Sequence, residues 1–204
     1  VNFSIYISLE KASIDKLNFT YQKGNTKKLN SKLYYKMSLE FKPVSLSKKY
    51  EISIGNSNGK KVKSIFVNCE NRSCVTKTIK NLTEGIYRVQ IRAINDAVYS
   101  EWSLPIYVIR QPRAQARFNK KNVQIKWEKI KGATGYDIYL CESKNGKYKK
   151  VASVGKNTTI KTVKKYKKKK LSAKTYYYYV VAKKKVEGKT YKSDKEFVYK
   201  VVNK

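Results

Sequence analysis

The sequence predicts an all-β protein built from two tandem β-sandwiches, and two observations carry this prediction. First, short stretches of alternating apolar and polar residues, separated by Gly and Asn turns, recur along the chain without helical periodicity. Second, the stretch 81–103 has a counterpart downstream, because Leu82, Tyr87 and Ala93 have the same spacing as residues 171, 176 and 182. A chain of 204 residues accommodates two such sandwiches of about a hundred residues each.

The first module has strand patterns at residues 35–41, 50–54, 62–68 and 75–79. Asn58-Gly59 is the dipeptide typical of a tight hairpin turn. Upstream, residues 2–9 alternate as a half-buried strand and residues 17–21 form a second short strand. Three assignments stay open for this start: an added hairpin, the last strand of a preceding domain, or an elaborated first strand.

The second module repeats the first two strand patterns without a gap at an offset of 86, so that Val123, Ile125, Trp127 and Tyr136 match Met37, Leu39, Phe41 and Tyr50. The offset becomes 89 at Leu171, so three residues are added between, near a lysine run. We therefore expect an N-terminal segment 1–24, a first domain 25–111 and a second domain 112–204.

Specific residues of the second module resemble a bacterial, Gram-positive extracellular fibronectin type III domain. They are the segment VQIKWEKIKGATGYDIYLCESKNGKYKKVASV with Trp127 and Tyr136, followed by Leu171 and Tyr176 at a tyrosine corner. The resemblance implies an immunoglobulin-like sandwich of seven strands in each module. It also implies a spacer, an adhesion module or a receptor ectodomain, since the family has no characteristic catalytic residues.

The composition argues against an enzyme. The chain has no histidine, which removes histidine-based acid–base catalysis and most zinc and copper sites. Its fourteen acidic residues lack the spacing of a calcium loop. We therefore expect no enzymatic activity, no cofactor and no metal.

The formal net charge is +33, and lysine supplies 41 of the 47 positive charges. Specific phosphate and base recognition relies on the planar fork of arginine, whereas lysine is a hydrated point charge. The excess therefore predicts salt-dependent attraction to polyanions without specific nucleic-acid recognition. The alternative is a lysine-rich coding bias on solvated faces.

Three groups of residues are candidates for a functional or structural role. The motif YSEWS places Trp102 beside Arg88 and Arg92, either as a receptor-type ladder or as a stack that stiffens the sheet. In the second module, outward strand positions form either a ligand face or rings covered by lysine stems; these are Tyr139, Tyr177, Tyr179 and Val181. A lysine-rich loop is either a polyanion grip or a solvated loop; it comprises Lys164, Lys165, Tyr166, Lys167, Lys168, Lys169 and Lys170.

Cys69 and Cys74 are spaced to bridge a hairpin tip, which suits an oxidising compartment. Cys141 falls on an outward strand position and is expected to be unpaired.

These features favour a non-catalytic spacer or adhesion module from a larger secreted or cell-surface bacterial protein. The sequence starts without a signal peptide and shows no anchor, which we interpret as a fragment of such a protein, and no apolar run is long enough for membrane insertion. The expected partner is a protein or carbohydrate at the cell surface, or an anionic polymer such as wall teichoic acid or a glycosaminoglycan. Two alternatives are accessory domains of an extracellular glycan-degrading enzyme and a polyanion-binding protein.

Overall fold

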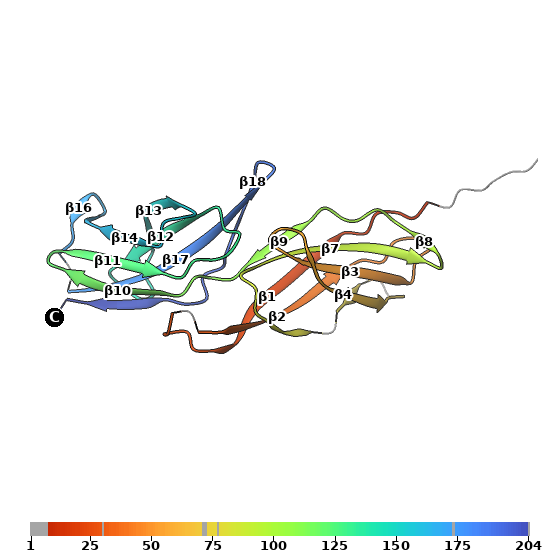
Figure 1. Cartoon of the computed structure of the whole chain (residues 1–204), viewed down its shortest axis with the longest axis horizontal. Coiled ribbons are helices and arrows are strands. Elements are labelled where there is room, and N and C mark those ends of the chain that lie inside the picture. Colours follow the sequence, from red (N-terminus) through yellow and green to blue (C-terminus); the bar gives the residue numbers. More distant parts are fainter. Residues whose placement is uncertain (1–7, 30, 71–72, 77, 173, 204) are drawn as a thin grey trace, which may run out of the picture. The chain divides into compact units, whose positions relative to one another are not determined.

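The chain folds into two compact units in this computed structural model (Figure 1). The structure describes residues 8–29, 31–70, 73–76, 78–172 and 174–203. Unit 1 comprises residues 1–20 and 35–107, and unit 2 comprises residues 21–34 and 108–204. All regular elements of the described residues are strands, as the alternating sequence pattern predicts.

Unit 1 consists of two antiparallel sheets. One sheet has the order β1–β2–β5, with β6 also paired to β2, and the other has the order β4–β3–β7–β8, with β9 also paired to β7. The strands are β1 (Ile14–Gly24), β2 (Leu33–Phe41), β3 (Lys49–Asn56), β4 (Lys61–Asn68), β5 (Cys74–Val75), β6 (Ile79–Leu82), β7 (Ile86–Asn95), β8 (Val98–Tyr99) and β9 (Ile106–Ile109).

Unit 2 repeats this arrangement. One sheet has the order β10–β11–β14, and the other has the order β13–β12–β17–β18, with β19 also paired to β17. Its strands are β10 (Ala114–Asn119), β11 (Asn122–Trp127), β12 (Gly135–Cys141), β13 (Lys149–Gly155), β14 (Ile160–Val163), β17 (Thr175–Val186), β18 (Lys189–Lys192) and β19 (Tyr199–Val202). The small hairpin β15 (Lys165–Tyr166) and β16 (Lys169–Lys170) is added between β14 and β17.

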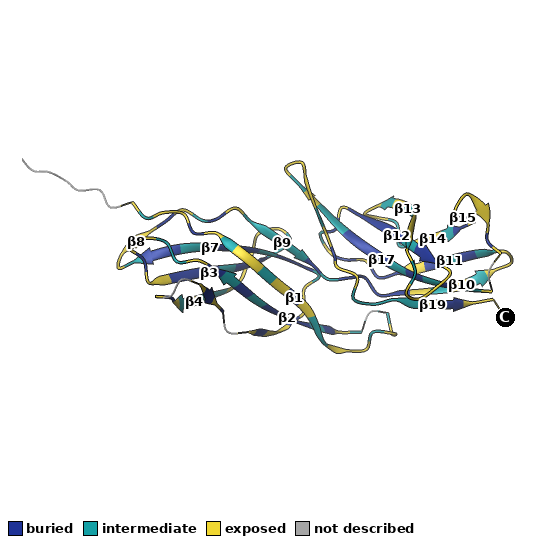
Figure 2. Ribbon diagram, turned by 180° about the vertical axis from the view of Figure 1, so that it is seen from behind, coloured by how far each residue is buried: buried dark blue, intermediate teal, exposed yellow. Residues whose placement is uncertain are grey.

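Each core lies between its two sheets and is filled by the alternate residues that face inward (Figure 2). In unit 1 the Phe41 and Tyr50 rings lie 4.9 Å apart, and in unit 2 the rings of Trp127 and Tyr136 lie 5.7 Å apart. Both pairs are fully buried and are related by the offset of 86. The sequence repeat therefore corresponds to equivalent aromatic packing in the two cores.

β1 is the edge strand of the first sheet of unit 1, where it lies next to β2. The expected strand at residues 17–21 lies inside β1, whereas most of the one expected at 2–9 lies outside the described residues.

The units divide the chain differently from the expected domains. The break falls between residues 107 and 108, and the segment 21–34, which joins β1 to β2, belongs to unit 2. Arg113 is buried and donates to the backbone carbonyl oxygens of Asn25 and Lys28 at 3.0 and 2.7 Å. Its Nε donates to Glu128 at 2.9 Å, and Arg110 also pairs with that carboxylate. A buried charge needs this full set of partners, so Arg113 holds the segment against unit 2.

Candidate functional site

The predicted stack in unit 1 has one arginine, not two. The Arg92 guanidinium lies 4.2 Å from the ring centroid of Tyr99 and 4.5 Å from that of Trp102, between two aromatic faces. The same guanidinium donates to the buried carboxylate of Glu51 at 2.9 Å. Arg88 instead hydrogen-bonds Gln90, so its predicted contact with Trp102 is not formed within the described part of the chain. With its charge neutralised by Glu51, Arg92 ties three strands together and offers little to a ligand.

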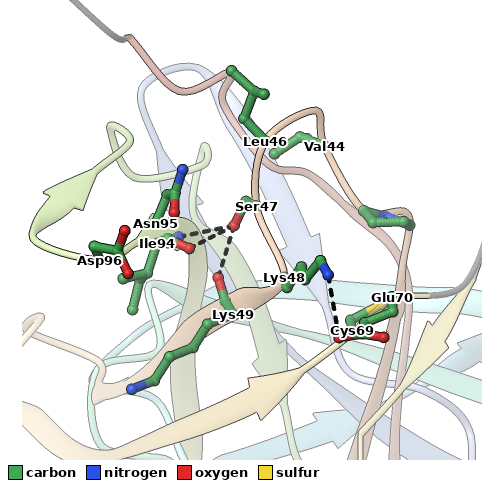
Figure 3. A pocket seen from close by; sticks show the side chains of 11 residues that line it. Val44, Leu46, Ser47, Lys48, Lys49, Cys69, Glu70, Ile94, Asn95 and Asp96 are labelled. Carbon is green, nitrogen blue, oxygen red and sulfur yellow. Dashed lines mark hydrogen bonds and ion pairs between the residues drawn. The ribbon is translucent and has the colours of Figure 1, made fainter.

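A hollow of about 880 Å³ lies at the end of unit 1 where three loops meet (Figure 3). The Ser47 hydroxyl donates to the carbonyl oxygen of Ile94 at 2.8 Å, which joins two of these loops. Cys69 belongs to the third loop, lines the hollow and forms a disulfide with Cys74. The rim has both signs of charge, because Lys48 pairs with Glu70 at 3.8 Å. The hollow therefore shows no preference for a ligand of either charge.

Unit 2 carries the stronger candidate, an aromatic cluster on the outer face of its second sheet. Tyr139 on β12 and Tyr179 on β17 are cross-strand partners, and their rings stack with centroids 4.8 Å apart and an interplanar angle of 9°. The Tyr148 ring lies 5.0 Å from that of Tyr179, and Lys195 Nζ lies 5.3 Å from the Tyr148 centroid. All three rings are half-buried, so each keeps one part open to a ligand.

Burial also raises the pKa of two hydroxyl groups in this cluster. It raises the pKa of Tyr148 to about 12, and neighbouring Cys141 adds to the effect. Burial and then the adjacent Tyr139 raise the pKa of Tyr179. Since an unperturbed tyrosine titrates near pH 10, both hydroxyls stay protonated at neutral pH. The surface then combines neutral rings with positive lysines.

A lysine-lined hollow of about 520 Å³ adjoins this cluster. It is lined by Val151 and by five lysines, which are Lys149, Lys150, Lys165, Lys167 and Lys168. Lys150 on β13 is the cross-strand neighbour of Tyr139, so one lysine of the hollow lies next to one ring of the cluster. We call Tyr139, Tyr148, Tyr177 and Tyr179, together with these five lysines and Lys195, the tyrosine–lysine surface.

The lysine run forms the hairpin β15–β16 rather than an irregular loop. Lys167 and Lys168 sit at its tip with φ of 50° and 66°. Positive φ at both central residues is the geometry of a tight hairpin turn, and it usually requires Asn or Gly. Two lysines held in this conformation are strained. The turn directs both of them, exposed, to the rim of the hollow.

Three sequence-based predictions about exposure are wrong. Val181, predicted on the open face, is buried, and Tyr166, predicted in the polyanion loop, is buried with its ring 5.9 Å from that of Tyr176. Cys141 is also buried rather than outward, because the turn after it approaches so closely that a Cβ on Gly146 would lie 2.7 Å from Cys141 Sγ. Alternation assigns a side chain to one face of a strand, but it does not reveal what covers that face.

Four members of the surface were missed from the sequence: Tyr148, Lys149, Lys150 and Lys195. The first three follow the Asn145-Gly146 turn, so the hairpin pattern could have placed them beside Tyr139. Lys195 lies beyond β18, and nothing in the local pattern indicates that it reaches the rings.

The described residues contain no group of three or more histidine, cysteine or acidic side chains placed to hold a metal ion. Within the same residues no helix is long and apolar enough to cross a membrane.

Two details of the units identify their fold. Both have a three-position sheet facing a four-position sheet in the same strand order. Both have a tyrosine corner, since the Tyr87 hydroxyl accepts from the backbone N–H of Thr83 and Glu84 at 2.9 Å and the Tyr176 hydroxyl from that of Ser172 at 3.1 Å. The chain is a tandem of two fibronectin type III folds.

Comparison with known proteins adds a family match and a large set of similar structures. Residues 35–102 match the family model described as a secretion system C-terminal sorting domain. The chain is similar to a two fibronectin type III domain segment from chicken tenascin, with 14% identity, coverage of 95% of this chain and 99% of that chain, and a TM-score of 0.40. It is also similar to the FN1–FN3 domains of chicken CNTN1, with 14% identity, coverage of 82% and 60%, and a TM-score of 0.34. The comparison with curated proteins gave no match.

The family match covers about a third of the chain, and its description concerns sorting by a secretion system.

Proposed function

We propose that the two fibronectin type III folds form a non-catalytic adhesion module and that unit 2 attaches it to an anionic glycan of a cell surface. The observation that carries the proposal is that Lys150, which lines the five-lysine hollow, is the cross-strand neighbour of Tyr139 in the stacked Tyr139–Tyr179 pair. One surface therefore offers rings and positive charges side by side.

The rings suit a sugar because they are large, flat and already ordered. A tyrosine presents an apolar body with a polar tip, so its face can pack against the C–H face of a pyranose while its hydroxyl stays hydrated. The contacts among Tyr139, Tyr148 and Tyr179 fix their orientation before a ligand arrives. Binding then costs less side-chain entropy than it would with mobile rings.

The lysines select for negative charge. Of the five that line the hollow, one forms an ion pair with another described residue, Lys167 with Glu142 at 3.6 Å. Mutual repulsion among the others is relieved when carboxylate, sulfate or phosphate groups enter the hollow. A neutral glycan would meet the rings but leave this repulsion in place.

The test measures binding of the full chain to immobilised heparin and to an array of neutral and acidic glycans at 150 mM salt. One variant combines Tyr139→Ser with Tyr179→Ser, and a second combines Lys149→Gln, Lys165→Gln and Lys168→Gln. We expect each to weaken binding to acidic glycans by at least about tenfold, which corresponds to about 1.4 kcal/mol.

The matched control replaces three exposed lysines outside the surface, with Lys42→Gln, Lys156→Gln and Lys189→Gln. It removes the same charge and is expected to change affinity less than about threefold, because charges beyond a Debye length of about 8 Å are screened. Equal losses in the control and the lysine variant would reduce the effect to net charge and contradict the proposal. Unchanged binding in the tyrosine variant would contradict the role of the rings.

A further inference from the structure

A second polar surface lies on the other sheet of unit 2, β10–β11–β14, and shares no residue with the tyrosine–lysine surface. Two hollows of about 390 and 600 Å³ open on its outer face. Both are lined by Gln115 and Lys126, which are cross-strand partners on β10 and β11. The two hollows therefore form one continuous groove, whose other lining residues include Arg117, Gln124, Lys28 and Lys129.

Arg117 is the most specific group in this groove. Its Nε donates to Gln124 Oε1 at 3.2 Å across the strand pair, which orients the side chain along the sheet. Within the described chain its two terminal nitrogens have no hydrogen-bond partner and no ion pair, and the side chain is exposed. A guanidinium held by Nε with both Nη atoms open matches the two oxygens of a carboxylate or sulfate.

Positive charge continues along the groove. Lys126 and Lys28 are exposed and have no ion pair among the described residues, and Lys129 Nζ contacts the Asn157 side-chain oxygen at 3.5 Å. The single acid in the lining is Glu128, whose buried carboxylate is already paired with Arg113 and Arg110. The groove therefore presents cations to solvent without a compensating surface acid.

The remaining lining groups are suited to hydroxyls. Gln124 keeps its amide N–H₂ free of partners within the described residues, and Gln115 likewise keeps its carbonyl oxygen. Asn157 and Thr159 line the larger of the two hollows. Amides and hydroxyls that offer both donors and acceptors can bond the hydroxyls of a sugar.

Two other classes of partner, a nucleic acid and an acidic protein, fit this groove less well. The lining of the smaller hollow has no aromatic ring on which a nucleic-acid base could stack, and base stacking is the usual source of affinity for single strands. Ile160 is the one large apolar side chain there, whereas the centre of a protein interface is generally rich in aromatic and apolar groups.

We propose that the outer face of the β10–β11–β14 sheet binds an acidic polysaccharide, with Arg117 gripping one carboxylate or sulfate and Lys126 and Lys28 contacting the next. Because Lys28 belongs to the segment held by Arg113, this groove is complete only when segment 21–34 is packed on unit 2. The proposal does not depend on the tyrosine–lysine surface. If both hold, unit 2 carries one polymer site on each sheet.

The test uses the full chain and oligogalacturonate of defined length, with binding measured by titration calorimetry at 150 mM salt. Arg117→Gln is expected to weaken one class of sites by about tenfold or more, because it removes the charge and the fork together. Arg117→Lys keeps the charge and is expected to recover less than half of the lost affinity in logarithmic terms. Lys189→Gln, which removes one charge from β18, is the matched control and is expected to stay within about twofold of the wild type.

Backbone amide shifts locate the site. Addition of the oligosaccharide should move the resonances of residues 115–117 and 124–126 in the wild type and in the Tyr139→Ser/Tyr179→Ser variant, but not in Arg117→Gln. Failure of the proposed function leaves these shifts intact, so the two ideas fail separately. Equal affinity in Arg117→Gln and Lys189→Gln would overturn the proposal. The proposal would also be overturned if single-stranded DNA of equal charge bound as tightly as the oligosaccharide and lost as much affinity in Arg117→Gln. The groove would then be a nucleic-acid site.

Discussion

The hydroxyl of Tyr87 ties the corner before β7 to the core of unit 1. It accepts two backbone N–H groups at 2.9 Å, and burial raises the pKa of Tyr87, so the hydroxyl stays neutral. Tyr87→Phe leaves both amides without an acceptor while the ring still packs. We expect a loss of about 1–2 kcal/mol in the free energy of unfolding, measured by chemical denaturation.

The control is Tyr99→Phe, because the Tyr99 ring is half exposed and still packs on Arg92 without its hydroxyl. Its expected cost is below about 0.5 kcal/mol. If both variants lose the same stability, the corner hydroxyl contributes nothing of its own.

Asp137 makes the stability of unit 2 depend on pH. The carboxylate is buried on β12 and accepts hydrogen bonds from Lys183 Nζ and Ser153 Oγ, each at 2.6 Å. Burial alone would raise its pKa, but these partners outweigh burial and hold the pKa of Asp137 below its usual range. A depressed carboxyl pKa stabilises the fold above the unfolded value, near 3.9, and this contribution is lost as the pH falls through the folded value.

We therefore expect the melting temperature of the wild type to fall between pH 5 and pH 2 more than that of Asp137→Asn, with the two curves converging at the acid end. Differential scanning calorimetry of the full chain at several pH values measures both curves. Parallel curves for the two proteins would mean that Asp137 does not contribute to the acid sensitivity.

At single residues, the sequence predicts which side chains face the core but not how exposed the outward side chains are. The inward positions of β2, β3, β11 and β12 follow from alternation, because burying one face of a strand fixes every second residue. The outward positions do not follow: Tyr139 is half-open whereas Val181, on the same face, is buried. What covers an outer face comes from long side chains and loops elsewhere in the chain, such as Lys195 over Tyr148.

At the scale of elements, the hairpin β15–β16 combines strain with exposed charge. Lys167 and Lys168 adopt positive φ, which costs a residue with a Cβ about 1–2 kcal/mol relative to the right-handed region. Lys167→Asn with Lys168→Gly supplies the residues that such a turn prefers. We expect thermal stability to rise, by about 0.5–1 kcal/mol, while retention on heparin falls.

Thermal melting and salt elution of the same preparation measure the two effects. The control Lys167→Gln/Lys168→Gln removes the same charge but keeps the strained backbone, so its retention should fall without any gain in stability. An equal gain in stability in the control and in the Asn–Gly variant would show that charge repulsion, not backbone strain, sets the stability of the turn.

The segment between β1 and β2 is the second element with a testable role. Nothing in its sequence indicated that it would pack on unit 2, because the signal is a buried arginine more than eighty residues away. Arg113→Ala removes the donors to Asn25 and Lys28 and leaves Glu128 with Arg110 alone. We expect unit 2 to lose about 3 kcal/mol or more, as is typical when one partner of a buried charge pair is removed.

Hydrogen exchange of residues 25–31 reports on this packing directly, and it should accelerate strongly in Arg113→Ala but not in the surface variant Lys121→Ala. Slow exchange of the segment in Arg113→Ala would contradict its dependence on this side chain.

At the scale of the whole molecule, the repeat in the sequence was enough to predict two sandwiches, because each buried skeleton must be complete within its own unit. Binding surfaces are less constrained. The two copies keep the same core and differ in their outer faces: unit 1 neutralises Arg92 with Glu51, whereas unit 2 gathers tyrosines and unpaired lysines. Ligand contacts therefore cannot be transferred from one copy to the other by the repeat.

The net charge of +33 makes salt the variable that separates general attraction from a local site. Each lysine that contacts a polyanion releases a counterion, so the slope of log affinity against log salt measures the number of contacts. Replacing Lys149, Lys165, Lys167 and Lys168 with glutamine should flatten this slope by about three contacts for heparin, because all four line one hollow. Replacing four exposed lysines outside it, at positions 42, 80, 156 and 189, should lower affinity at 50 mM salt but leave the slope nearly unchanged. Equal slopes in the two variants would mean that the polymer contacts the whole positive surface and does not bind preferentially at the hollow.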